Sequence, residues 1–295
     1  MPSRPPRFPR EAAENPRDRH ATPRQRASAT IDPMHRIRHL PAHRPASAAP
    51  ALVAVAHGSR DPRTPQAVAA LLDRVRELRP GLDVRLGHIE LNAPLLPDAL
   101  DALGAREAVL VPLLLGRGHH VKHDIPASAA AAPALRARIA APLGPHPLLV
   151  EALHDRLTEA GWHASERGSA VVLAAAGSRD PESAADARHT ARLLGERLGG
   201  VPVVPAYASA ASPTVPAAVR ALAARGHRRI AVASYFTAPG RFASAAAAHA
   251  PWIAAAPLGA HPALARLVLH RYDEARAAGA ALCDIPMTTR FAASA

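Results

Sequence analysis

Residues of types that can bind metal ions follow three successive apolar segments of this sequence. His57 directly follows the first segment, and Glu90 lies at the end of the second. The loop 116–123 follows the third segment and contains His119, His120 and His123. Imidazole binds iron, cobalt, nickel and zinc, and a carboxylate adds an oxygen ligand or a base. Because a site with few protein ligands leaves positions open for a substrate, the pattern predicts an open metal site made by His57, Glu90 and a loop histidine.

The turn that contains His57 occurs twice in the chain, and only its first copy has the histidine. Residues 53–62 read Val-Ala-Val-Ala-His-Gly-Ser-Arg-Asp-Pro, and residues 172–181 read Val-Leu-Ala-Ala-Ala-Gly-Ser-Arg-Asp-Pro. A second repeat, Ala-Pro-Leu-Gly-x-His-Pro, stands at 141–147 and 256–262. The chain therefore consists of two related halves. Since the second turn persists with an alanine in place of the histidine, the turn itself does not need His57, which favours a chemical role for this residue.

The other candidates also have ordinary structural interpretations. Glu90 fits a solvated strand end as well as a ligand, and its counterpart in the second half is Ser209. His88 shares a strand face with Glu90 by two-residue alternation and is a further candidate ligand. Residue types alone do not choose among the loop histidines, and the corresponding loop 237–241 has none.

Both halves alternate short apolar strands with amphipathic helices. Strands are expected at 51–56, 84–91, 108–115 and 136–141, and again at 170–175, 201–206, 229–236 and 252–256. Helices are expected at 65–79, 94–103, from about 124, and at 147–160, and again at 182–198, 213–225, 241–248 and 262–277. This order predicts an α/β fold of two tandem, related, doubly wound parallel sheets, each covered by helices and each with its first strand inside the sheet. Ligands bind such sheets beyond the carboxyl ends of the strands, where the polar groups described above lie.

Charge and composition divide the chain further. Residues 1–48 hold ten arginines against four acidic residues, a net +6 of the formal +12, and their Pro/Arg-rich composition predicts a disordered tail. The expected domains are residues 49–162, with the metal site, and residues 168–280, a degenerate repeat. A second tail is expected at 281–295.

Composition also excludes several classes of protein. The single cysteine, Cys283, rules out an internal disulfide and a cysteine-ligated iron–sulfur cluster. Apolar runs are too short to span a membrane, and only 3% of the residues are aromatic, so neither a membrane protein nor a base-stacking nucleic-acid binder is expected. The cysteine usage fits a cytoplasmic protein, which is the expected location.

Two other enzymatic interpretations fit poorly. Ser59, beside His57, lacks the G-x-S-x-G pattern of a hydrolase nucleophile. The Gly-Arg-Gly segment at 116–118 is too short for a dinucleotide-binding motif and follows the third strand instead of the first.

Three segments of the first half form a recognisable set. They are Ala-His-Gly-Ser-Arg at 56–60, Glu-Leu-Asn-Ala-Pro at 90–94, and Pro-Leu-Leu-Leu-Gly at 112–116 leading to His-Val-Lys-His-Asp-Ile-Pro at 120–126. This set closely resembles the sirohydrochlorin chelatases, the class II chelatases of the CbiX type. The resemblance extends over about residues 50–280, and the long form of that family likewise has two chelatase-like halves in one chain.

The resemblance implies an enzyme, a lyase that inserts a divalent metal ion into sirohydrochlorin, a carboxylate-rich tetrapyrrole. It also implies that the reaction needs no ATP and no cofactor beyond the metal substrate. The metal-binding histidines of the family correspond to His57 and His120, and its acidic residue corresponds to Glu90. These three residues are then both the metal ligands and the catalytic residues.

The second half departs from the family pattern at each of these positions, with Ala176, Ser209 and Arg241. It resembles a structural half that closes over a central cleft faced by both domains. Three cations near the predicted ligands, Arg60, Arg117 and Lys122, are expected to bind the carboxylates of the tetrapyrrole. Ordinary solvated charge is the alternative interpretation of these cations, and the roles of His119 and His123 stay open.

The ligand types do not choose between iron and cobalt, since both ions accept imidazole and carboxylate. Ferrous iron, for sirohaem biosynthesis, is preferred because the chain lacks the His-rich tract and cysteine cluster of some long cobalt-associated relatives. Cobalt insertion for corrinoid synthesis and a non-catalytic tetrapyrrole or metal carrier are the alternatives. The expected partners are sirohydrochlorin and the metal ion, without nucleic acid or membrane.

Overall fold

The computed structural model describes residues 49–163 and 168–283, which include both repeated halves. The predicted tail at 1–48, and the predicted C-terminal tail from residue 284 onward, lie outside the described residues.

The helices and strands follow the alternating order expected from the sequence. In the first half they are β1 (Ala51–Ala56), α1 (Arg63–Leu78), β2 (Val84–His88), α2 (Leu96–Asp101), β3 (Glu107–Pro112), η1 (His120–Asp124), α3 (Ile125–Ala130), β4 (Arg136–Ile139) and α4 (Pro147–Glu159). In the second half they are β5 (Ser169–Ala175), α5 (Pro181–Arg197), β6 (Val203–Tyr207), α6 (Val215–Ala224), β7 (Arg229–Tyr235), α7 (Arg241–Ala247), β8 (Ile253–Ala254) and α8 (Pro262–Cys283). The last helix, α8, continues past the predicted end at Ala277.

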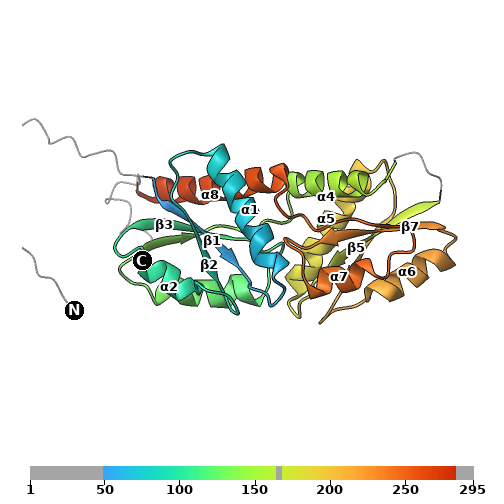
Figure 1. Cartoon of the computed structure of the whole chain (residues 1–295), viewed down its shortest axis with the longest axis horizontal. Helices are drawn as coiled ribbons and strands as arrows, with labels where there is room; N and C mark the ends of the chain where they lie inside the picture. Colours follow the sequence, from blue (N-terminus) through green and yellow to red (C-terminus); the bar gives the residue numbers. More distant parts are fainter. Residues whose placement is uncertain (1–48, 164–167, 284–295) are drawn as a thin grey trace, which may run out of the picture. The chain divides into compact units, whose positions relative to one another are not determined.

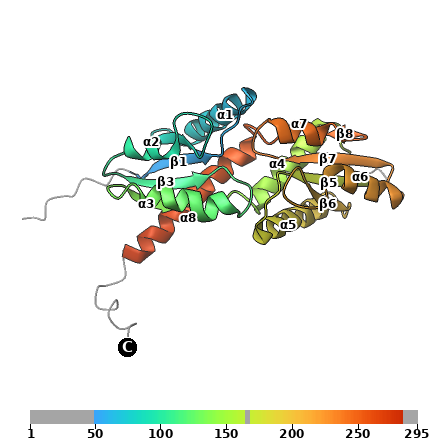
Figure 2. The ribbon, with the colours of Figure 1, turned by 90° about the horizontal axis from the view of Figure 1, so that it is seen from below.

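Each half forms one four-stranded parallel sheet, with the same strand order in both. The first sheet has the order β2-β1-β3-β4 and the second the order β6-β5-β7-β8, as Figure 2 shows for the inner strands. The first strand of each half therefore lies inside its sheet, and the prediction of two tandem doubly wound sheets is confirmed.

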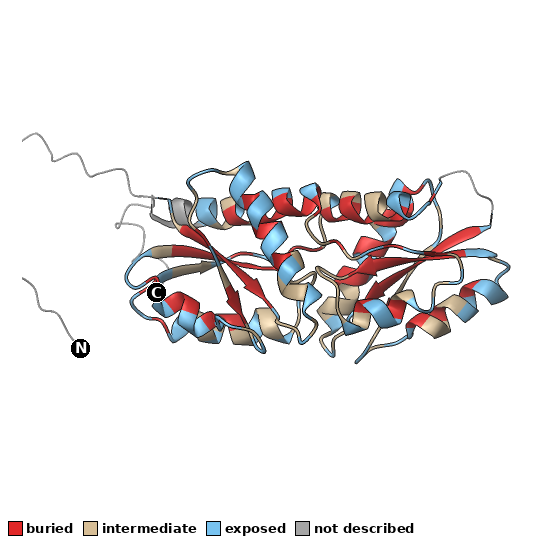
Figure 3. Ribbon diagram, in the orientation of Figure 1, coloured by how far each residue is buried: buried red, intermediate tan, exposed pale blue. Residues whose placement is uncertain are grey.

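Helices cover both faces of each sheet (Figure 1). Leu52 and Ala54 of β1 belong to a core shared with α1, whereas their neighbours Val53 and Val55 belong to a separate core with α2 and α3. The strand β5 repeats this alternation between α5 on one face and α6 and α7 on the other. Because successive side chains of a strand point to opposite faces, a strand buried on both sides is apolar throughout, and Figure 3 shows β1 and β5 buried along their length.

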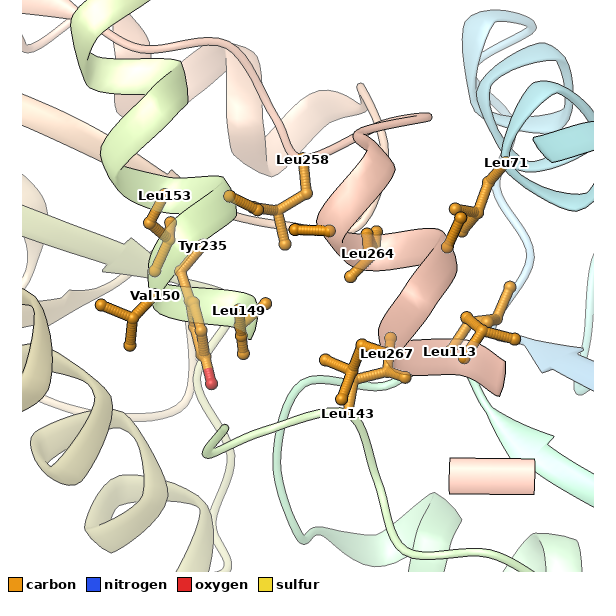
Figure 4. Close-up of a cluster of buried hydrophobic side chains, with 14 of the residues drawn as sticks. Leu71, Leu113, Leu143, Leu149, Val150, Leu153, Tyr235, Leu258, Leu264 and Leu267 are labelled. Atoms are coloured by element: carbon orange, nitrogen blue, oxygen red, sulfur yellow. The ribbon is translucent and has the colours of Figure 1, made fainter. Parts of the chain in front are cut away.

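The last helix of each half packs against the other half. The helix α4 contacts α5 and β7, whereas α8 contacts α1, β3 and β4. Leu264 and Leu267 of α8 are fully buried in one cluster with Leu71 of α1 and Leu113 (Figure 4). Because this cluster contains buried residues of both halves, one core extends across both sheets. Each such buried leucine contributes about 1.5–3 kcal/mol to stability.

The second strand ends earlier than its apolar pattern predicts. β2 stops at His88 instead of continuing to Leu91, although the N–H groups of Ile89 and Glu90 still donate to the carbonyls of Ala56 and His57. Leu91 has a φ of +68°, a left-handed conformation that breaks a strand. Glu90 therefore lies in the loop after β2 and not at the end of the strand itself.

The loop predicted at 116–123 closes in a π-helical turn, η1, which leads directly into α3. The N–H of Ile125 donates to the carbonyl of His120, five residues earlier. In a regular α-helix the ring of Pro126 would clash with the carbonyl four residues before it, and the wider turn avoids this clash.

The second repeated motif of the sequence caps two helices. His146 precedes α4 and its Nδ1 accepts from the N–H of Leu148 at 3.1 Å; His261 precedes α8 and its Nδ1 accepts from the N–H of Ala263 at 3.2 Å. Both histidines must leave Nδ1 unprotonated to act as acceptors. Burial, followed by the nearby Arg271, lowers the pKa of His146, and burial, followed by Arg156, lowers that of His261.

These caps predict a stability that falls in acid. Each histidine binds a proton less readily in the folded chain than its ordinary pKa of 6.5 implies, so its contribution is complete above pH 6.5 and is lost as the pH falls through the lowered folded pKa. A helix cap is worth about 0.5–2 kcal/mol. The double variant His146→Asn/His261→Asn keeps both caps without a titrating ring, and thermal unfolding between pH 8 and pH 5 should show a smaller loss of Tm than in the wild type. Parallel Tm curves for the two proteins would show that the caps do not titrate in this range.

Candidate functional site

The loops after β1 and β2 are joined through their backbones, which fixes His57 beside Glu90. The N–H of Glu90 donates to the carbonyl of His57 at 3.0 Å. Gly58 has a φ of +101°, and a Cβ at this position would lie 1.9 Å from the carbonyl oxygen of Glu90. Only glycine allows the two loops to approach so closely.

The second half repeats this construction without the histidine and the glutamate. The N–H of Ser209 donates to the carbonyl of Ala176 at 2.9 Å, and a Cβ on Gly177 would lie 1.9 Å from the carbonyl oxygen of Ser209. The correspondence of Ala176 with His57, and of Ser209 with Glu90, is therefore a structural one. The scaffold of the turn is intact in both halves, and only the first half carries an imidazole and a carboxylate on it.

The serine of the repeated turn belongs to this scaffold. Ser59 Oγ accepts from the N–H of Asp61 at 3.0 Å, and Ser178 Oγ accepts from the N–H of Asp180 at 3.1 Å. Because the same bond occurs in the half that lacks the histidine, it gives the serine a turn-forming role and offers nothing to the hydrolase interpretation.

The structure brings the three predicted ligands together. The ring centres of His57 and His120 lie 4.6 Å apart with their planes perpendicular, and His57 Nδ1 lies 3.5 Å from Glu90 Oε1. The exposed fractions of the three side chains are 45% for His57, 53% for Glu90 and 35% for His120, so all three are accessible to a ligand.

The orientation of His120 is set by a residue that the sequence patterns did not identify as functional. His120 Nδ1 lies 2.5 Å from Asp124 Oδ2. Because a carboxylate accepts, Nδ1 carries the hydrogen and Nε2 keeps its lone pair for a metal. The i, i+4 spacing of the two residues is the signal for this pair, since the turn between them places both side chains on one face.

His57, like His120, has its Nε2 atom free to bind a metal. Its Nδ1 faces the carbonyl of Gly58 at 3.3 Å and Glu90 at 3.5 Å, which leaves Nε2 available. With metal–nitrogen bonds of about 2.1 Å, two imidazoles on one ion hold their ring centres roughly 4.6–5.3 Å apart, and the observed 4.6 Å lies at the short end of this range. No group of three or more His, Cys, Asp or Glu side chains in 49–163 and 168–283 is arranged to hold a metal, so the arrangement amounts to two imidazoles with a carboxylate behind one of them.

The other candidate histidines lie outside this pair. His88 is buried, and its Nδ1 contacts the carbonyl of Pro94 at 3.2 Å, which is a structural role at the end of β2. His119 stacks near His123, with ring centres 4.7 Å apart, and its Nε2 lies 3.8 Å from Asp124 Oδ1. The ring of His119 also lies near that of His120, with ring centres 6.2 Å apart, so His119 and His123 are neighbours of the pair.

The three predicted substrate-binding cations are placed differently from one another. Arg60 is exposed in the loop after His57. Arg117 and Lys122 instead form ion pairs with the second half, Arg117 with Asp186 and Glu182, and Lys122 with Asp180 and Glu182. Binding of substrate carboxylates by Arg117 and Lys122 stays a prediction, and it would compete with these ion pairs.

The ion pairs across the two halves stabilise the charged forms of both partners. Hydrogen bonds to Asp180 raise the pKa of Lys122, and in return Lys122 lowers the pKa of Asp180. Two further hydrogen bonds join the start of α1 to the second half. Thr64 Oγ1 donates to the carbonyl of Pro239 at 2.6 Å, and Arg63 Nη2 donates to Ser244 Oγ at 3.2 Å. The loops beyond the carboxyl ends of both sheets therefore meet around His57 and His120.

None of the helices in the described part of the chain is long and apolar enough to cross a membrane.

Comparison with known proteins gives consistent matches over both halves. The CbiX family model matches residues 51–160 and 170–275. A sirohydrochlorin ferrochelatase of Bacillus subtilis is 31% identical over 170 residues, which are 55% of this chain and 64% of that protein. A sirohydrochlorin cobaltochelatase of Methanococcus aeolicus is 35% identical over 79 residues, which are 26% of this chain and 55% of that protein. The chain thus spans less than two thirds of the length of these curated relatives.

Solved structures share the fold. SirB from Bacillus subtilis with Fe3+ superposes with a TM-score of 0.63 and 25% identity, covering 79% of this chain and 98% of that one. The structure of CbiX described as the terminal enzyme for biosynthesis of siroheme in denitrifying bacteria gives a TM-score of 0.60 at 24% identity, over 76% of this chain and 99% of that one. The second likeness, at this identity, supports the fold alone.

Proposed function

This chain belongs to the CbiX family, and from that premise we propose that it inserts a divalent metal ion, ferrous iron before cobalt, into sirohydrochlorin without ATP. The observation that carries the proposal is the exposed pair of His57 and His120, whose rings meet at the distance expected for two ligands of one ion. The same turn without its histidine in the second half supports a chemical purpose for the pair.

The two imidazoles would bind the incoming ion through their Nε2 atoms. Asp124 holds His120 in the tautomer that this requires, and Glu90 lies on the Nδ1 side of His57. Two protein ligands leave most of the coordination positions open, so the ion can exchange water for the nitrogens of the macrocycle. A loosely held ion suits transfer, since a closed set of four ligands would retain it.

Insertion of a divalent ion releases the two pyrrole protons of the macrocycle, and a nearby group must receive them. Glu90 is more exposed than Asp124, and we assign it this role as a general base that takes each proton in turn and passes it to water. Because it faces Nδ1 of His57 and not Nε2, direct ligation of the same ion by Glu90 stays a prediction. Arg60, exposed three residues after His57, is placed to bind a carboxylate of the tetrapyrrole.

Iron is proposed first because the chain lacks the His-rich tract and cysteine cluster of some long cobalt-associated relatives. The relatives themselves do not separate the metals, since a ferrochelatase matches over 170 residues and a cobaltochelatase of Priestia megaterium over 191. The ligand set itself accepts both ions. A direct test is anaerobic incubation of the purified protein with sirohydrochlorin and Fe²⁺ or Co²⁺, separately and then in competition, followed by absorbance spectroscopy.

Each outcome of this test has a distinct meaning. Faster incorporation of iron than of cobalt supports the proposal as stated. Faster incorporation of cobalt keeps the insertion reaction and corrects the metal. Stoichiometric binding of sirohydrochlorin without any metallated product would replace the enzyme with a carrier.

A further inference from the structure

The loop that carries His120 is attached to the second half on both sides of the histidine. Arg117, three residues before it, pairs with Asp186, and Lys122, two residues after it, pairs with Asp180 and Glu182. All three carboxylates lie at the start of α5, in the half that has no metal ligands of its own.

Asp186 is the most buried of these carboxylates. Its side chain is 3% exposed, and its oxygens accept three bonds from Arg117: from the backbone N–H at 2.8 Å, from Nε at 3.1 Å and from Nη2 at 2.6 Å. The backbone bond matters most for geometry, because it fixes the main chain of the loop and not only a long side chain. A Cβ on Gly116 would already lie 3.5 Å from Asp186, so the loop rests directly against this residue.

The second attachment is also rigid. Lys122 Nζ lies 2.6 Å from Asp180 Oδ2 and 2.5 Å from Glu182 Oε2. Asp180 caps α5, since its Oδ1 accepts from the N–H of Glu182 at 3.0 Å. The partners of Lys122 are thus held at the first turn of a long helix and not on a free loop.

The start of the loop is held by the same half. Tyr235 Oη donates to the carbonyl of Leu115 at 2.7 Å, and Thr237 Oγ1 donates to the carbonyl of Leu113 at 2.9 Å. Tyr235 Oη in turn lies 3.2 Å from Thr190 Oγ1, whose single hydrogen is shared between Tyr235 Oη and the backbone carbonyl of Asp186. These polar contacts link α5 to the exit of β3.

We propose that Asp186 is a positioning residue that acts on His120 through Arg117, so that the half without ligands sets the geometry of the metal site. Asp180 and Glu182 complete the attachment through Lys122. The inference rests on the proposed function for its chemical meaning, since His120 is taken as a metal ligand. It gives the degenerate half a specific task, which is to hold the His120 loop at the correct distance from His57.

The chain contains an ion pair that serves as a matched control. Arg79 and Asp273 also join two oxygens to a guanidinium across the two halves, both at 2.7 Å, but they link α1 to α8 and do not touch the His120 loop. Asp273→Asn removes a carboxylate from such a pair as Asp186→Asn does, so any effect common to both variants is structural.

The experiment measures binding of Co²⁺ alone, by its visible absorption, together with amide exchange of residues 116–124, in the full chain. Asp186→Asn should weaken Co²⁺ binding by about 10-fold, the usual cost of losing a residue that orients a ligand, and should speed amide exchange in that segment. Asp273→Asn should change neither. In an Arg117→Ala background, Asp186→Asn should cause a smaller further loss than in the wild type, because the side-chain bonds are already gone and only the backbone N–H bond to residue 186 remains.

Unchanged Co²⁺ affinity in Asp186→Asn, or an equal loss in Asp273→Asn, would overturn the positioning role. If Co²⁺ binding to the wild type is too weak to measure, the KM for the metal in the insertion assay replaces it, with the same 10-fold rise expected and the same control.

The two proposals fail separately. A wild-type protein that binds Co²⁺ and loses affinity in Asp186→Asn, yet never metallates sirohydrochlorin, would retain the positioning role and lose the proposed function. If the wild type inserts metal and the Asp186→Asn variant inserts it equally well, the proposed function is retained and the positioning role is lost.

Discussion

Replacing His57 with alanine is expected to lower metal insertion into sirohydrochlorin by at least about 100-fold, because it removes one of the two imidazoles proposed to hold the ion. The fold should survive the change. The side chain of His57 is 45% exposed, and the second half keeps the same turn with Ala176. The measurement is the initial rate of insertion under anaerobic conditions, with Tm recorded on the same preparation.

A control for the loss of an imidazole is His189→Ala, on the exposed surface of α5, which should leave the rate unchanged. Insertion by His57→Ala within a few-fold of wild type, at an unchanged Tm, would remove the pair of histidines as the metal site. The proposed mechanism would then need a different first ligand.

Gly58→Ala and Gly177→Ala should destabilise the protein to a similar degree and yet differ in activity. Each added Cβ would lie 1.9 Å from a backbone carbonyl oxygen, and real Cβ contacts stay above 3.0 Å, so each carbonyl must move by about 1 Å. Left-handed φ angles add to the cost. A loss of roughly 2–5 kcal/mol is expected for each, or a fall in Tm of about 5–15 °C.

The activities should separate the two variants. Gly58→Ala displaces Glu90 from His57, and a displacement of about 1 Å at a catalytic site can cost about 100-fold in rate. Gly177→Ala displaces the loop of Ser209, which carries no predicted ligand, so its insertion rate per folded molecule should fall less than that of Gly58→Ala. Equal losses of rate in both variants, measured well below their Tm values, would show that the two halves respond as one body and that the first turn has no special role.

Much of the fold follows from local patterns in the sequence. The apolar run 51–56 predicts β1 with its observed bounds, because a strand buried on both faces needs no polar residue. The repeated turn predicts that His57 and Ala176 occupy equivalent positions in the two halves. The structure confirms this, because the glycines that follow them have φ angles near +100° and +90°. Glu90 was expected in the sheet and lies in the loop, because the left-handed Leu91 ends β2 early.

The parts that could not be predicted depend on contacts between distant segments. Arg117 and Lys122 have the charge and position of substrate-binding residues, and nothing in their own neighbourhood shows that carboxylates of α5 meet them. The packing of α4 and α8 against the opposite halves could not be predicted either, because the sequence of an amphipathic helix does not specify which sheet its apolar face covers. Asp124 was visible in the sequence, but its bond to His120 needed the π turn that places the two side chains together.

The packing of α8 against the first half also determines when the core of that half can be completed during protein synthesis. Tyr272 Oη donates to the carbonyl of Pro50 at 2.7 Å, a bond between residues 222 positions apart. At usual rates of translation, roughly 10–40 s pass between the emergence of β1 and that of α8. Throughout this interval the apolar residues that α8 covers in the folded protein, Leu71 among them, stay uncovered on the nascent chain. The half that contains His57 and His120 is thus synthesised first, and its core is completed last, by a helix from the end of the chain.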